Sequence, residues 1–203
     1  TRMQDEVITG IANLIESRDG STGLHVKNTQ NYVQILTKAL REKGMYPDIL
    51  DHNYELNTVK ASVLHDIGKI KTPDAILLKP GRLTDEEFEV MKQHTVAGCE
   101  IIDRIIGNVE HEEYVEIARY HHERWDGTGY PDGLSGEEIP LCARIMALAD
   151  VFDALYQDRC YKKAIRPASK VFEIIKENSG SQFDPNLTEI FLELQREITD
   201  ISE

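Results

Sequence analysis

The side chains best suited to chemistry in this sequence are histidines and aspartates that recur along most of its length. Two adjacent pairs stand out, His65–Asp66 and His121–His122, and a run reading Asp-Gly-Thr-Gly-Tyr-Pro begins at Asp126. The candidate metal ligands are His25, His65, Asp66, His94, His121, His122 and Asp150. Imidazole and carboxylate groups without neighbouring thiolates are typical ligands of a hydrolytic metal centre. The three cysteines are widely separated and form no CxxC pair, so the sequence predicts a nitrogen and oxygen site.

The positions of the two pairs are unusual, one because its neighbours are apolar and the other because its histidines are adjacent on a helix. His65–Asp66 lies in the apolar stretch Val63–Lys69, where two polar side chains are costly to bury unless something pairs with them. Adjacent histidines diverge by about a third of a turn on a helix, so His121 and His122 can hold one ion only at a helix end. Isolated histidines such as His52 and His111 are better interpreted as packed or solvent-exposed side chains.

Asp150 and Asp153 are three residues apart and therefore share one helix face. Their neighbours are apolar, which predicts burial and a cationic partner for at least one of them; a pair of solvated carboxylates is the alternative. Local positive charge comes from Lys69, Arg159, Lys162 and Lys163.

Apolar residues at helical spacing indicate which elements position these groups. The expected helices are Glu6–Glu16, about Leu24–Lys43, Leu56–Ile67, one that begins at the capping box Thr84–Glu87, Glu112–His122, Pro140–Leu155, one from Pro167 to just before Gly180, and Asn186–Ile198. The expected fold is all-α, a single compact bundle of about seven to nine helices over residues 1–203, with a glycine-rich loop at 127–136. Residues 1–15 fit either core packing or a connector helix from an upstream domain.

Composition limits the possible partners. The chain has 203 residues and a formal net charge of −13, which disfavours polymeric nucleic acid and anionic membranes as partners. No apolar run reaches the roughly 18 residues needed to span a bilayer, so no direct membrane insertion is expected. An odd number of scattered cysteines favours a reducing compartment, and the expected localisation is cytoplasmic.

The order of these motifs resembles the HD-GYP domain, a group within the HD phosphohydrolase superfamily. The resemblance rests on His25, His65–Asp66 within His-Asp-Ile-Gly-Lys, His94, His121–His122, the Asp126–Pro131 run and Asp150, followed by Asp-Arg-Cys-Tyr-Lys ending at Lys162. It extends from about Glu16 to the segment Phe183–Pro185. It implies a bacterial cytoplasmic phosphodiesterase that hydrolyses cyclic di-GMP to pGpG or onward to GMP.

The resemblance also implies a role for each matching residue. His25, His65, Asp66 and Asp150 would hold one metal, while His94, His121 and His122 would hold a neighbouring metal together with Asp66. Asp66 and Lys69 would be catalytic, and Asp153 would support the metals. The substrate contacts would be Lys69, Tyr130, Pro131, Arg159 and Lys162, with Tyr130 and Pro131 on the guanine side.

Some relatives hold a third metal with a glutamate that is Ser21 in this chain. Because a serine hydroxyl is a poor ligand for a hard cation, we expect two divalent ions rather than three, with iron or manganese favoured over zinc. A hydroxide bridging the two ions would attack phosphorus, and the reaction would then stop at pGpG.

Two other functions stay open at this point. One is a catalytically weak domain that senses cyclic di-GMP or docks a protein, and the other is an HD phosphohydrolase for another nucleotide. A homodimer and an upstream sensor or receiver domain are further expectations.

Overall fold

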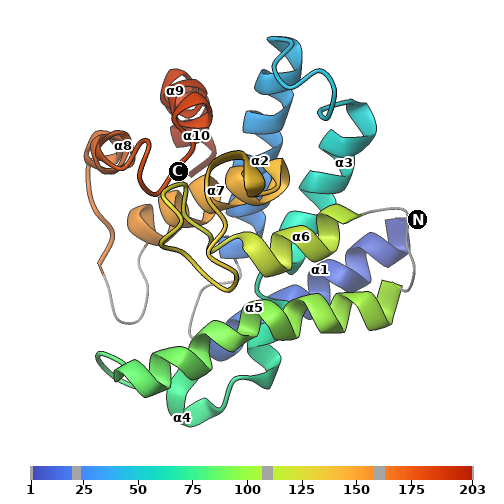
Figure 1. The fold of residues 1–203 in the computed structure, drawn as a ribbon, viewed down its shortest axis with the longest axis vertical. Helices are drawn as coiled ribbons and strands as arrows, with labels where there is room; N and C mark the ends of the chain where they lie inside the picture. The colour runs from blue at the N-terminus through green and yellow to red at the C-terminus, as the bar shows by residue number, and fades with distance from the viewer. Residues whose placement is uncertain (1, 20–23, 107–111, 158–162, 203) are drawn as a thin grey trace.

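The computed structural model describes residues 2–19, 24–106, 112–157 and 163–202. Within these ranges the chain is helical and contains no strand, which confirms the all-α expectation (Figure 1). The α-helices are α1 (Arg2–Glu16), α2 (Leu24–Glu42), α3 (His52–Ala61), α4 (Asp74–Leu77), α5 (Asp85–Ile106), α6 (Glu112–Tyr120), α7 (Leu141–Tyr156), α8 (Ala168–Glu177), α9 (Pro185–Glu193) and α10 (Gln195–Ser202). These described helices number ten rather than seven to nine, because α4 is a single short turn and the expected last helix divides at Leu194.

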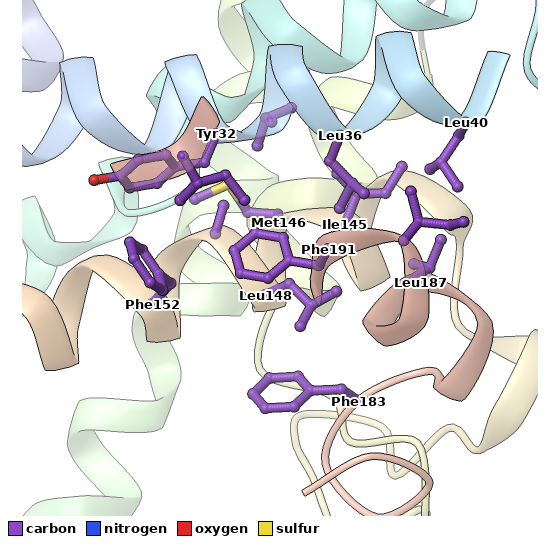
Figure 2. Close-up of a cluster of buried hydrophobic side chains, with 14 of the residues drawn as sticks. Tyr32, Leu36, Leu40, Ile145, Met146, Leu148, Phe152, Phe183, Leu187 and Phe191 are labelled. Carbon is purple, nitrogen blue, oxygen red and sulfur yellow. The ribbon is translucent and has the colours of Figure 1, made fainter. Parts of the chain in front are cut away.

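The main hydrophobic core lies between α2, α7 and the C-terminal helices. Figure 2 shows Tyr32 and Leu36 of α2 facing Met146 and Phe152 of α7, with Phe191 of α9 between them. Most side chains of α7 are buried, as expected for a helix that is apolar on nearly all sides. This central helix therefore gives Asp150 a fixed position. None of the helices in the described ranges is long and apolar enough to cross a membrane.

A second cluster joins the N-terminal half to α5 and α6. It contains Ala12 and Ile15 of α1, Leu64, Ile102 of α5 and Ala118 of α6, all buried. In Figure 1, α5 runs through the lower part of the molecule, far from α8 and α9, and it packs directly against α6. The two clusters hold the helices that carry the candidate ligands.

The helix predicted over Leu56–Ile67 is wrong at both ends. Asp51 caps the start of α3, because its side chain accepts a hydrogen bond from the Tyr54 amide at 2.7 Å. The α-helix ends at Ala61 and is replaced by two 3-10 segments, Ser62–Leu64 and Ile67–Lys71. The second segment packs directly against α5. His65 and Asp66 therefore lie between two tight turns rather than at the end of an α-helix.

The predicted capping box is confirmed. The Thr84 amide donates to Glu87 at 2.8 Å, and the Glu87 amide donates to the Thr84 hydroxyl at 3.3 Å. Because α5 begins where the box requires, its register is fixed, and His94 faces the interior.

Candidate metal centre

Asp66 lies at the centre of the histidines that the sequence singled out. Its Oδ1 atom is 3.2 Å from His94 Nε2 and 3.6 Å from His121 Nε2, and its Oδ2 atom is 3.3 Å from His65 Nε2. On the other side, His25 Nε2 is 3.6 Å from Asp150 Oδ1. Residues between the two 3-10 segments, on α2, α5 and α7, and directly after α6 therefore meet in one place.

Backbone hydrogen bonds fix the orientation of three imidazole rings. His65, His94 and His121 each direct Nδ1 at a main-chain carbonyl oxygen. The acceptors are the carbonyls of Ser62, Met91 and Ile117, at 2.8, 2.7 and 2.8 Å. Because a carbonyl only accepts, Nδ1 carries the proton and Nε2 keeps a free lone pair when the ring is neutral. All three lone pairs point toward Asp66.

These lone pairs have no donor to satisfy them. Nε2 of His65, His94 and His121 and Oδ1 of Asp66 are buried without a hydrogen-bond partner in the described structure. Buried polar atoms are rarely left unpaired, and neutral rings and a carboxylate that present only acceptors cannot satisfy one another. A cation among them would satisfy all four. The residues present therefore fit a metal ion.

Two groups of side chains could hold such ions, with their ligand atoms within 4.8 Å of one another. One group contains Asp66, His94, His121 and His122, and the other contains His25, His65 and Asp150. The first group has the same members as one set implied by the resemblance, and the second contains three members of the other set but not Asp66.

Burial and neighbouring charges hold most of these groups in the state that binds a metal. Burial raises the pKa of Asp66 and Asp150, but the charges and hydrogen bonds around them outweigh it. Lys69, His65 and His121 together hold the pKa of Asp66 well below its usual range, and His65 and His25 bring that of Asp150 to about 2. Burial lowers the pKa of both His121 and His122, which favours neutral rings.

His65 differs from the other rings. Burial lowers its pKa, but Asp66, Asp150 and Glu16 together outweigh burial and raise the pKa to about 9. Metal binding at this ring must therefore release a proton, which makes metal affinity dependent on pH.

Asp153 contacts His25 rather than a candidate ion position. Its Oδ2 atom accepts a hydrogen bond from His25 Nδ1 at 2.6 Å, and its Oδ1 atom accepts one from Asn28 at 3.2 Å. A carboxylate behind a histidine fixes the ring and leaves Nε2 directed at the site.

Lys69 and Glu16 form the charged border of the centre. Lys69 Nζ is 2.7 Å from Asp66 Oδ2 and 3.4 Å from Glu16 Oε1. Glu16 is 3% exposed, and together with His25 and Asp66 it forms a third group that could hold an ion. Sequence reasoning missed Glu16, although it continues the buried face of α1 one turn after Ala12. Ser21 lies outside the described residues.

The loop after His122 is tied to the body of the protein at several points. Glu123 accepts hydrogen bonds from the amides of Asp132 and Gly133, at 2.7 and 3.0 Å. The amides of Trp125 and Asp126 donate to carbonyls of the segment before α9, at 3.1 and 2.9 Å. These hydrogen bonds hold the loop in a fixed position next to the candidate ligands.

Tyr130 packs on His122, a candidate metal ligand. Its ring stacks on His122 with a centroid distance of 4.9 Å and an interplanar angle of 27°. One face of Tyr130 is thus covered by a protein side chain, and Pro131 follows it half-buried. Arg159 and Lys162, the other predicted substrate contacts, lie outside the described residues.

A cavity of about 350 Å³ opens beside these ligands. His121, His122, Asp150 and Tyr130 line it, and residues that the sequence prediction did not name complete its wall. The latter include Phe88, Lys92, Arg124 and Gln182. Such a volume lies at the lower end of the range for small-molecule sites, about 300–1,000 Å³.

Comparison with known proteins agrees with this geometry. The chain is 45% identical over 203 residues to a "Cyclic di-GMP phosphodiesterase" of Vibrio cholerae, covering 98% of this chain and 41% of that protein. It is 38% identical over 188 residues to a "3'3'-cGAMP-specific phosphodiesterase 2" of the same organism, covering 93% of this chain and 34% of the relative. The chain thus spans less than half the length of either curated relative.

Solved structures share the fold. A cyclic GMP-AMP specific phosphodiesterase of V. cholerae superposes with a TM-score of 0.66 at 17% identity, covering 95% of this chain and 50% of that one. The HD domain family matches residues 11–187, a segment that includes every candidate ligand. The motifs, the fold and this match agree, and the chain belongs to the HD domain family, as its resemblance to HD-GYP proteins predicted.

Proposed function

We propose that this chain hydrolyses a phosphodiester bond of cyclic di-GMP in a metal-dependent reaction. The observation that carries the proposal is the set of four buried, unsatisfied acceptor atoms around Asp66, next to an open cavity. The cyclic di-GMP phosphodiesterase that is 45% identical over the same residues supports the substrate. Divalent ions bound here would activate a water molecule and neutralise charge on the phosphoryl oxygens.

Protein side chains would bind the phosphate, orient a metal ligand and limit the access of water. Lys69, 13% exposed at its side chain and 2.7 Å from Asp66, would donate to a non-bridging phosphate oxygen. Asp153 would keep His25 in the orientation that the site needs. Tyr130 would cover His122 and limit access of bulk water to it.

We propose two ions, iron or manganese, because nitrogen and carboxylate ligands without thiolates suit these metals. Glu16 supplies a buried carboxylate that the sequence prediction did not consider, so the number of ions is a direct test. With two ions we expect pGpG as the product; rapid accumulation of GMP would contradict that expectation. A cytoplasmic setting, a homodimer and an upstream sensor or receiver domain stay predictions.

The test is anaerobic purification followed by elemental analysis and a cyclic di-GMP assay on the same sample. The wild-type protein should contain metal and release pGpG with manganese or ferrous iron. His121→Ala should lose metal and activity, whereas His52→Ala should keep both, because His52 is exposed on α3 and 69% of its side chain is accessible. Asp66→Ala should be inactive. A metal-free wild-type protein that still hydrolyses the substrate would refute the proposal.

A second candidate is a phosphodiesterase for 3',3'-cGAMP, favoured by the relative that is 38% identical. Rates measured on both cyclic dinucleotides under the same conditions distinguish the two. Binding of cyclic di-GMP without any hydrolysis at saturating metal would instead identify a sensor domain.

A further inference from the structure

One wall of the cavity next to the ligands is built by α5 and has no role in the reaction described so far. Phe88 and Lys92 lie one turn apart on α5 and both line this cavity. Lys92 Nζ is 5.0 Å from the centroid of the Phe88 ring and 5.6 Å from that of Tyr130. The rings of Phe88 and Tyr130 meet edge to face at 6.0 Å.

The two rings are not equally available to a ligand. Tyr130 stacks on His122 and is half-buried. Phe88 keeps 42% of its surface exposed and lines the cavity, so its ring is accessible from the cavity. Phe88 is therefore the better stacking surface for a planar ligand group.

Lys92 adds a hydrogen-bond donor beside that surface. Its ammonium group bonds to Glu89 at 2.6 Å, and Glu89 is exposed on the preceding turn of the same helix. Exposed pairs of this kind contribute little free energy, so Lys92 can exchange Glu89 for a ligand at small cost. Guanine offers two adjacent acceptors, O6 and N7, whereas adenine replaces O6 with an amino group.

We propose that Phe88 and Lys92 form a base subsite in which a guanine of the substrate stacks on Phe88 and accepts a hydrogen bond from Lys92. His122 and Asp150 line the same cavity, so a base held on α5 leaves its phosphate directed toward the metal ligands. This inference rests on the proposed function for the identity of the substrate. It assigns the preference for guanine to a helix that also carries His94.

The test measures binding separately from hydrolysis. GMP and AMP are titrated calorimetrically into manganese-loaded wild-type protein and three variants. Phe88→Leu keeps an apolar side chain against Tyr130 but removes the aromatic face, and Lys92→Met keeps the stem without the donor. Val90→Ala is the matched control, because Val90 is exposed on the same helix and does not line this cavity.

Phe88→Leu should weaken binding of both nucleotides about tenfold, the loss expected when a base loses an aromatic partner. Lys92→Met should weaken GMP about tenfold and AMP by less, because adenine keeps the N7 acceptor but lacks O6. Val90→Ala should bind as the wild-type protein does, and metal content should be equal in all four proteins.

Wild-type protein that binds no GMP, or a Phe88→Leu variant that binds it as tightly as the wild type, would overturn the subsite. Loss of metal in Phe88→Leu or Lys92→Met would also overturn it, because the effect would then be structural. If the wild-type protein binds GMP as described but does not hydrolyse cyclic di-GMP, the subsite stands and the proposed function fails.

Discussion

Gly68 and Gly98 face each other where the 3-10 segment Ile67–Lys71 crosses α5, and they should respond oppositely to the same substitution. A Cβ atom on Gly68 would lie 1.8 Å from the carbonyl oxygen of His94 and 2.5 Å from the amide nitrogen of Gly98. Both are main-chain atoms and cannot rotate away. A Cβ on Gly98 would meet its nearest neighbours at 3.4 Å, an ordinary contact.

The size of the effect follows from these distances. Carbon and oxygen normally approach to about 3.5 Å, so Gly68→Ala must separate the two segments by more than about 1 Å. Overpacking typically costs about 1–3 kcal/mol, and we expect about 3 kcal/mol because no side chain can give way. For a chain of this size that corresponds to a fall of about 6–12 °C in Tm. Gly98→Ala should be neutral or stabilise by up to about 1 kcal/mol through helix propensity.

Thermal unfolding of both variants with a chelator present measures stability without metal, and elemental analysis measures metal content. Gly68→Ala should also lose metal, because the shift moves His94 away from Asp66, now 3.2 Å from it. If Gly68→Ala unfolds at the wild-type temperature with full metal content, the close approach does not position His94, and our account of the site is wrong.

Three further predictions concern the support of the site. Asp153→Asn should weaken metal affinity about 10–100-fold without unfolding the protein, as measured by metal titration against the exposed control Asp48→Asn. Arg144→Met should lower the free energy of unfolding in urea by about 3–5 kcal/mol, because it leaves Asp184, 2.6 Å away, buried without its ionic partner. Lys38→Met, which breaks an exposed pair, should lower it by less than about 1 kcal/mol. Chelation should lower Tm, and manganese at about 100 times its Kd should restore about 2.7 kcal/mol; an unchanged Tm would argue against metal binding to the folded state.

The sequence by itself determined the ligand types, their order and most helix positions. Helical periodicity is a local property, so the start of α5 at its capping box and the ends of α2 and α6 could be predicted from nearby residues. The pairing of His121 with His122 at a helix end also followed from local geometry. The division of the candidate ligands into two groups came instead from the resemblance to HD-GYP domains.

Contacts between distant segments could not be predicted in this way. Glu16 reaches Lys69 from α1, Tyr130 covers His122, and the 3-10 segment replaces a predicted helix because it must pass close to α5. Phe88 and Lys92 likewise join the site only because α5 lies beside the loop that carries Tyr130. Spacing along the chain records which residues share a face, but only packing of the folded chain decides which faces meet.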